Sequence, residues 1–276
     1  MDNKNQLIDL DAVIARRNKK LDFWLPKFVK SRLKKIIHQN DVNEIITLFG
    51  HNEGIDFVND ILKHLRITTE TIGAEKVLAA GLDKKFVFVS NHPLGGLDGL
   101  AIISSVFSYF GKTKAVINDI LLNIYSLKPV FHGVNVFGHT TKQQIAALDE
   151  LYTSDSQIIV FPAGLVSRKY GNVVTDTPWK KSFLTKAIQH KRDIVPVYIS
   201  GRNSRFFYNF AKIRKLIGIK LNIELVLLPA EVFKYKGNTI TITFGNVIPV
   251  TTFSQEKPVE DWVAYIREKV YQLAKK

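Results

Sequence analysis

Residues 86–110 read FVFVSNHPLGGLDGLAIISSVFSYF, and this stretch decides the fold. Residues 86–89 are apolar and favour β structure, which is typical of a short strand buried in a parallel sheet. The apolar residues 99–110 are typical of a buried helix. Residues 90–98 then form the turn between strand and helix, where open α/β sheets place their ligands. We therefore predict an α/β fold with a functional site in this turn.

The turn contains one histidine and one aspartate. His92 is the only side chain there that takes up a proton near neutral pH, and Asp98 at the helix start can hold its imidazole in one tautomer. The chain contains no cysteine and no Gly-x-Ser-x-Gly elbow. We interpret the pair as a dyad that activates the substrate's own hydroxyl or amine. The alternative is that Asn91, Asp98 and the glycines only form and cap the turn.

Composition narrows the class of protein and of partner. The 276 residues, 46% of them hydrophobic, fit one α/β domain with an appendage or two domains. Without cysteine there is no disulfide and no cysteine-ligated metal, and the histidines lack ligand spacing, so we expect no metal site. The net charge of +14 and the pI near 9.7 favour binding to polyanions such as anionic lipid surfaces, nucleic acid or acidic carriers.

Residues 1–37 contain ten Lys and Arg and only four Asp. A helix starting near Pro26 places apolar side chains on one arc and lysines on the other, which is the pattern of an interfacial helix. The alternative is a helix whose apolar face packs on the core. We find no secretory signal and no apolar run of about 18 residues, so we expect a peripheral protein on the cytoplasmic face of a membrane.

The rest of the chain alternates between segments with the two-residue apolar period of a strand and segments with the 3.6-residue apolar period of a helix. We expect strands near residues 66–72, 84–90, 112–120, 157–161, 193–200, 222–228 and 239–244. Helices are expected in 40–65, 99–110, 121–127, 141–152, 178–190, 206–217 and 259–274. This alternation indicates a largely parallel central sheet with helices on both faces.

The motif NHPLGGLDG at 91–99 resembles the first signature of the glycerolipid and lysophospholipid acyltransferases, an Asn-His pair followed by an Asp after a β-strand. Five residues separate His92 from Asp98 where that family usually has four, and we expect the paired glycines to absorb the extra residue. Three further stretches resemble the later signatures in order: FHGVNVFGHTTK at 131–142, FPAGLVSRK at 161–169 and IVPVYI at 194–199.

The second and third stretches depart from the family pattern. Gly138-His139 stands where the family has an acidic-basic pair, and Ala163 stands where it has a glutamate. In the family these signatures bind the acceptor's phosphate and glycerol. Their loss favours an acceptor with an amino-acid head group, such as a lyso-ornithine or lyso-glycine lipid, with lysophosphatidate as the alternative.

The resemblance implies a glycerol-3-phosphate acyltransferase-like fold, with a helical, basic, membrane-associating region at 1–70 and a catalytic domain at 71–276. His92 would be the general base and Asp98 its partner. Backbone N–H groups around Gly164 or in the Gly95-Gly96 turn would stabilise the oxyanion. The implied substrate-binding residues are Asn91, Gly95, Gly96, Gly133, His139, Thr140, Lys142, Phe161, Pro162, Gly164, Ser167, Arg168 and Lys169. For the basic residues among them, a solvated loop is the alternative.

The resemblance also implies an acyl donor, either acyl-CoA or acyl carrier protein, and no cofactor. The expected partners are the lipid acceptor, the acyl thioester and an anionic membrane surface, with no nucleic acid. The competing class is a non-catalytic basic protein that binds lipid surfaces or nucleic acid on the same fold. Salt discriminates between them, because an electrostatic binder loses affinity as ionic strength rises.

Overall fold

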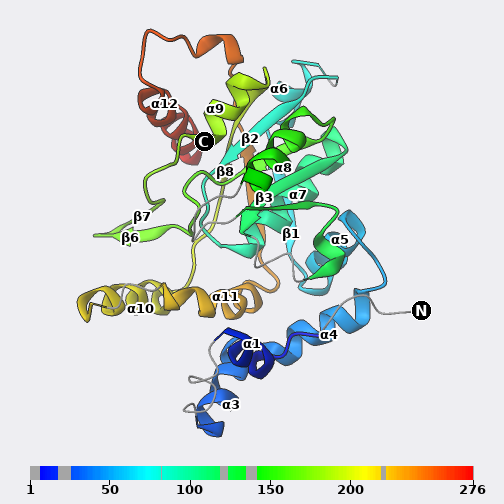
Figure 1. The fold of residues 1–276 in the computed structure, drawn as a ribbon, viewed down its shortest axis with the longest axis vertical. Helices are drawn as coiled ribbons and strands as arrows, with labels where there is room; N and C mark the ends of the chain where they lie inside the picture. Colours follow the sequence, from blue (N-terminus) through cyan, green and yellow to red (C-terminus); the bar gives the residue numbers. More distant parts are fainter. Residues whose placement is uncertain are drawn as a thin grey trace.

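A seven-stranded sheet forms the centre of the computed structural model, which describes residues 7–17, 26–81, 83–118, 124–134, 142–218 and 222–275 (Figure 1). The strand order is β1-β9-β8-β2-β5-β3-β4. The strands from β8 to β4 are parallel, whereas β9 pairs antiparallel with β8 and parallel with β1. The strands are β1 (Thr68–Ile72), β2 (Phe86–Ser90), β3 (Thr113–Asn118), β4 (Phe131–Val134), β5 (Gln157–Val160), β8 (Asp193–Ile199) and β9 (Thr239–Phe244). The predicted α/β fold with a largely parallel sheet is confirmed.

Strand β2 lies in the middle of this sheet, and all five of its residues are buried. Successive side chains of a strand point to opposite faces. Phe86 and Phe88 accordingly enter one hydrophobic core, and Val87 and Val89 enter the other. A strand covered on both faces has no polar side, which explains its uninterrupted apolar sequence.

Helices form a layer on each face of the sheet (Figure 1). The core that contains Phe88 is covered by α5 (Ile55–His64), α6 (Ala74–Leu78) and α7 (Gly96–Phe110). The core that contains Val87 is covered by α8 (Lys142–Thr153), α9 (Ser182–Gln189) and α12 (Val259–Gln272). Helix α7 is directly attached to β2 through the turn that contains His92.

Several smaller elements lie beyond the carboxyl ends of the parallel strands. After β5 the chain forms the hairpin of β6 (Arg168–Tyr170) and β7 (Val173–Thr175), and after β8 it forms α10 (Arg205–Leu216) and α11 (Leu228–Lys234). Val166, Phe207 and Tyr208 make a separate small core between them. Single 3₁₀ turns occupy Tyr125–Leu127, Ile223–Leu227, Val250–Thr252 and Leu273–Lys275.

The N-terminal helices are α1 (Leu10–Arg17), α3 (Lys27–Ile36) and α4 (Gln39–Phe49). Helix α3 contains no buried residue. The expected boundary between residues 70 and 71 needs correction, because it falls inside β1 and because α5 packs in the main core. In the part of the chain that is described, no helix combines the length and apolarity needed to cross a bilayer.

The strand predicted at residues 222–228 is wrong. Residues Ile223–Leu227 form a 3₁₀ turn, and α11 follows with Pro229 in its first turn. A short apolar run does not distinguish strand from helix, and proline at a helix start favours the latter. The helix expected at 121–127 is described only at Tyr125–Leu127, as a 3₁₀ turn. The hairpin of β6 and β7 and the edge strand β4 were not predicted.

Candidate active site

The turn between β2 and α7 brings His92 and Asp98 together. Nδ1 of His92 lies 3.0 Å from Oδ2 of Asp98, whose side chain is fully buried. The distance is that of a hydrogen bond, although the ring is tilted away from ideal alignment. Such bonds often align only when substrate is bound. Because Nδ1 faces the carboxylate, Nε2 is the nitrogen that can accept a proton from a substrate.

Backbone N–H groups of the turn hold the carboxylate in place. Those of Leu94 and Gly95 donate to Oδ2 of Asp98 over 2.8 and 3.0 Å. Gly95 has φ +84°, and a Cβ there would lie 3.1 to 3.3 Å from side-chain atoms of Leu228 and Val166. Gly95 thus gives the backbone the left-handed conformation that fits five residues between His92 and Asp98.

We expect Gly95→Ala and Gly96→Ala to have opposite effects on stability. Gly95→Ala combines an unfavourable φ with a tight contact, so the free energy of unfolding should fall by about 1–3 kcal/mol. Gly96 is helical and a Cβ there meets nothing within 4 Å. Gly96→Ala should raise the free energy of unfolding by up to about 1 kcal/mol. Urea unfolding measures the free energy of unfolding of both variants. Equal changes would show that the positive φ of residue 95 does not require glycine.

Burial also sets the electrostatics of the pair. It raises the pKa of Asp98 above its usual range, and the hydrogen bond and charge of His92, with the N–H groups of Leu94 and Gly95, oppose that rise. An ionised Asp98 in this position favours a proton on Nδ1 of His92 and stabilises the imidazolium that forms when Nε2 takes up a second proton.

The backbone and the ring of His92 are fixed from the opposite side. Its N–H donates to Oδ1 of Asp176 over 3.2 Å, and its carbonyl accepts from the Ser167 N–H over 2.7 Å. The Phe161 ring lies against the imidazole with centroids 4.4 Å apart. The third signature therefore reaches His92 through Phe161 and Ser167.

Asp176 is a residue of this site that sequence analysis missed. Its buried carboxylate accepts hydrogen bonds from the Ser167 hydroxyl over 2.5 Å and from the Trp179 indole N–H over 2.9 Å, besides the His92 N–H. Its own N–H donates to the Tyr271 hydroxyl of α12. Asp176 lies 84 positions from His92 and belongs to no motif, so only the folded chain brings the two together.

Similarity to known proteins identifies the family of this chain and two named relatives. A family model described as acyltransferase matches residues 12–276. The chain belongs to this acyltransferase family. Two relatives, both named lyso-glycine lipid O-acyltransferase, come from Bacteroides thetaiotaomicron and Phocaeicola vulgatus. The first is 41% identical over 268 residues, covering 97% of both chains. The second is 37% identical over 268 residues, covering 97% of this chain and 95% of the relative.

One solved structure resembles the acyltransferase at low similarity. It is the crystal structure of the 1-acyl-sn-glycerophosphate (LPA) acyltransferase PlsC from Thermotoga maritima, with a TM-score of 0.46 and 16% identity. The match covers 96% of this chain and 92% of that one. A likeness of this size carries no argument about the site.

Two predicted substrate-binding residues of the acyltransferase hold its backbone. The Asn91 amide donates to the Ile199 carbonyl over 2.9 Å and accepts from the Ile199 N–H over 2.7 Å. The Ser167 hydroxyl is bonded to Asp176 and buried. These contacts anchor both sides of the His92 turn, the first to β8 and the second to the hairpin, and the substrate contact expected of Asn91 and Ser167 stays a prediction.

Arg168 also differs from its expected role. Its guanidinium is buried and lies 2.9 Å from Oε1 of Glu224, while Arg214 lies 2.8 Å from Oε2 of the same carboxylate. Burial lowers the pKa of Arg168, and the charge of Glu224 opposes that effect. Arg168 therefore ties the hairpin to the segment before α11, and it is not placed to hold a head group.

We expect Arg168→Met to act on stability. Removing one partner from a buried ion pair typically costs about 3–5 kcal/mol, so the thermal midpoint should fall markedly. Lys169→Met, at the exposed neighbouring position, should leave the midpoint nearly unchanged. Differential scanning calorimetry of the two variants measures this. An unchanged midpoint in Arg168→Met together with a raised KM would restore the head-group role.

The remaining predicted residues lie in several places. Gly133 is on the edge strand β4, paired with Ile117, and Lys142 is the exposed first residue of α8. His139 and Thr140 lie outside the described residues. Pro162 is buried and its carbonyl accepts from the Lys180 N–H. Lys169 is exposed and lines a cavity described below.

The N–H groups expected to stabilise an oxyanion are partly occupied. That of Gly95 is bonded to Asp98, and that of Gly164 donates to the Phe161 carbonyl over 2.9 Å. Among the described residues no acceptor is bonded to the Gly96 N–H, in the first turn of α7. First-turn N–H groups lie at the positive end of the helix dipole. Gly96 is therefore the one of the three whose N–H has no partner in the described part of the chain.

Proposed function

We propose that this acyltransferase moves a fatty acyl group from an acyl thioester to the hydroxyl of a lyso-glycine lipid, with His92 as general base. The observation that supports it most is the His92–Asp98 contact at the carboxyl edge of the sheet, with Nε2 of His92 directed away from the carboxylate. A histidine oriented through Nδ1 by a buried carboxylate is the arrangement that general-base catalysis requires.

The proposed reaction has two steps. Nε2 of His92 takes the hydroxyl proton while the acceptor oxygen attacks the thioester carbonyl carbon, and the Gly96 N–H donates to the resulting oxyanion. The tetrahedral intermediate then breaks its C–S bond, and the thiol leaves with the proton from the imidazolium. Asp98 stabilises the imidazolium between the steps. The products are an ester and a free thiol, and the chain itself is never acylated.

The acceptor is proposed from the relatives and from the altered signatures together. Both relatives are named for a lyso-glycine lipid. This chain has Ala163 where the glycerolipid and lysophospholipid acyltransferases usually have glutamate, and the guanidinium of Arg168 is paired with the carboxylate of Glu224. Neither residue is thus available for a glycerol phosphate, which disfavours lysophosphatidate as the acceptor.

The test is a comparison of lipid extracts by mass spectrometry from cells that express the chain and are supplied with lyso-glycine lipid, lyso-ornithine lipid or lysophosphatidate. A diacylated glycine lipid that appears only with the intact chain is the expected result. A product from lysophosphatidate alone would replace the proposed acceptor. No product from any acceptor, with folded protein present, would favour the non-catalytic binding protein.

We further propose that α3 and α10 contact an anionic membrane surface. Both lie at the same end of the molecule (Figure 1). Phe28 on α3 and Phe206, Ile213 and Leu216 on α10 are more than half exposed, and lysines or arginines accompany them on both helices. Exposed apolar side chains flanked by basic ones are the pattern of an interfacial helix.

Vesicle sedimentation tests the membrane contact. Phe28→Ser/Ile36→Ser should reduce binding to vesicles that contain anionic lipid, because it removes the apolar face of α3. The matched control is Tyr109→Ser/Ile188→Ser, which removes two exposed apolar side chains from α7 and α9. An equal loss of vesicle binding in both variants, or no loss in either, would contradict the proposed contact of α3 with the membrane.

A further inference from the structure

A polar cavity of about 560 Å³ lies between the hairpin of β6 and β7, the loop that follows β8 and the start of α10. Its lining includes three cationic side chains, those of Lys169, Arg202 and Arg205. Asn172, Asn203 and Tyr208 add further polar groups. No aspartate or glutamate is among its lining residues in the part of the chain described. The cavity therefore favours an anionic ligand.

The three cations are not neutralised by the protein. Within the described ranges, neither Lys169 nor Arg202 nor Arg205 forms an ion pair or a hydrogen bond. Helix α10 begins at this cavity, but its first turn is already capped by the Ser204 hydroxyl, which together with the Ser204 N–H donates to the Glu231 carboxylate, so the positive charge of the cavity comes from the three side chains. Cations held near one another without counter-charges are a feature of anion sites.

Asn203 supplies an independent sign of a ligand. The residue is 5% exposed, and its side-chain Nδ2 has no hydrogen-bond partner among the described residues. A buried amide donor without an acceptor is costly, and native proteins rarely leave one without a role. The Asn203 N–H donates to the Tyr208 hydroxyl over 3.1 Å, which fixes the residue on the cavity wall. A ligand oxygen would satisfy its Nδ2.

The cavity shares its walls with the elements that position His92. Lys169 is two residues from Ser167, whose N–H is bonded to the His92 carbonyl. Arg202 and Asn203 follow β8, whose residues 193–197 pair with the whole of β2. Leu94 of the catalytic turn packs where a side chain on Gly201 would lie. The cavity and the dyad therefore belong to neighbouring parts of one substrate-binding region.

We propose that this cavity binds the phosphate at the end of the pantetheine arm of the acyl donor. This rests on the proposed function, since it assumes an acyl thioester. The pantetheine arm separates its terminal phosphate from the thioester. A donor whose thioester lies at His92 therefore has its phosphate in a neighbouring site, where this cavity lies. Three cations provide more positive charge than the single carboxylate of a glycine head group needs. The phosphate is common to acyl-CoA and acyl carrier protein.

Calorimetric titration of the full chain with CoA, with pantetheine, and with holo and apo acyl carrier protein tests the proposal. Pantetheine lacks the phosphate, and the apo carrier lacks the whole phosphopantetheine arm. Arg202→Gln/Arg205→Gln should weaken binding of CoA or the holo carrier by about tenfold or more, because it removes two charged donors to the phosphate. Whichever of the two binds the wild type identifies the source of the phosphate.

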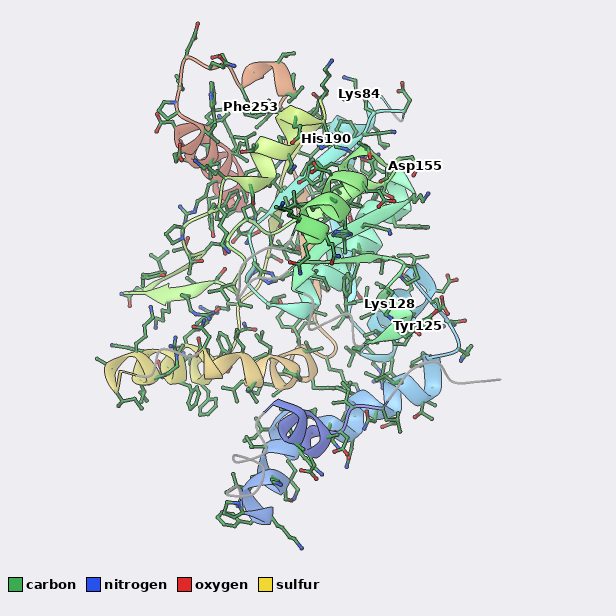
Figure 2. All side chains as sticks on the ribbon, viewed as in Figure 1. Lys84, Tyr125, Lys128, Asp155, His190 and Phe253 are labelled. Carbon is green, nitrogen blue, oxygen red and sulfur yellow. The ribbon has the colours of Figure 1, made fainter. Side chains whose placement is uncertain are left out.

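The matched control changes the same net charge elsewhere. Lys85→Gln/Lys191→Gln lies at the opposite end of the strands, where Figure 2 shows the neighbouring Lys84 and His190 far from the hairpin and α10. This control should leave binding unchanged. Lys169→Gln gives a second variant of the cavity should the double one not fold. Thermal midpoints report folding for all variants.

Three results would overturn the proposal: equal weakening in both double variants, wild-type binding of pantetheine as tight as that of CoA, or no binding of CoA and holo carrier. A raised KM for the acceptor with an unchanged KM for the donor would also overturn it and assign the cavity to the head group. The lipid comparison above is independent, because product formation tests the reaction whether or not this cavity binds the donor.

Discussion

Replacing His92 by alanine should reduce turnover by about 10²- to 10⁴-fold, because the variant loses the general base that accepts the hydroxyl proton. The effect should fall on kcat more than on the KM of either substrate, since a proton transferred in the transition state contributes little to ground-state binding. Turnover of a purified acyl thioester, followed through the released thiol, measures it.

His51→Ala is the matched control. His51 is an exposed histidine in the turn between α4 and α5, and its removal should leave kcat and the thermal midpoint close to wild type. Comparable turnover in His92→Ala and His51→Ala would show that the dyad does not catalyse the reaction.

Asp98→Asn should lower kcat by about 10³- to 10⁴-fold while making the protein more stable. The amide oxygen can still accept from Leu94 and Gly95, so the turn keeps its shape. That oxygen takes the place of Oδ2, which is also the atom that faces Nδ1 of His92, so the contact with the ring persists but its negative charge is lost. A neutral amide cannot stabilise the imidazolium that forms during proton transfer, and in an unrelated serine protease the corresponding substitution costs about 10⁴-fold.

The expected gain in stability depends on pH. Burial raises the pKa of Asp98 in the folded chain above its ordinary value of 3.8. Between these two pKa values the folded state binds more protons than the unfolded state, so Asp98 lowers the free energy of unfolding as pH rises through that window. Asparagine does not titrate. The stability of Asp98→Asn relative to wild type should therefore be highest near neutral pH and should shrink as the pH is lowered toward 4.

Thermal melts of both proteins between pH 4 and pH 7 measure the difference. Asp155→Asn is the control, since Asp155 is largely exposed in its pair with Lys112 (Figure 2). Surface pairs contribute little, so its melting curve should follow the wild type at each pH. A lower midpoint for Asp98→Asn at neutral pH would show that the charge of Asp98 is stabilising in this site.

Local sequence was sufficient for the centre of the site. The run at 86–110 predicted β2, the turn and α7, because an apolar strand, paired glycines and an apolar helix each have a short-range signature. Asp98 follows His92 by only six positions, so the turn itself brings them into contact. Their short separation, with two glycines between them, was sufficient to predict that the two side chains lie together.

Long-range contacts decided the roles of the basic third signature. From sequence, Ser167 and Arg168 were expected to contact substrate, since nothing nearby identifies a partner. The fold places Asp176 against Ser167 and Glu224 against Arg168, 9 and 56 positions away. Both polar groups are thereby buried and bonded within the protein, and Lys169 alone among the three faces the cavity.

Sequence by itself determined the fold class, the central strand and the contact between His92 and Asp98, because hydrophobic periodicity and glycine-rich turns act over a few residues. Only the tertiary structure decided which polar residues hold the turn and which line a cavity. Asp176 comes from the connection between β5 and β8, whereas Arg202 and Asn203 come from the loop after β8. Parallel strands bring such connections together at one edge regardless of their separation along the chain.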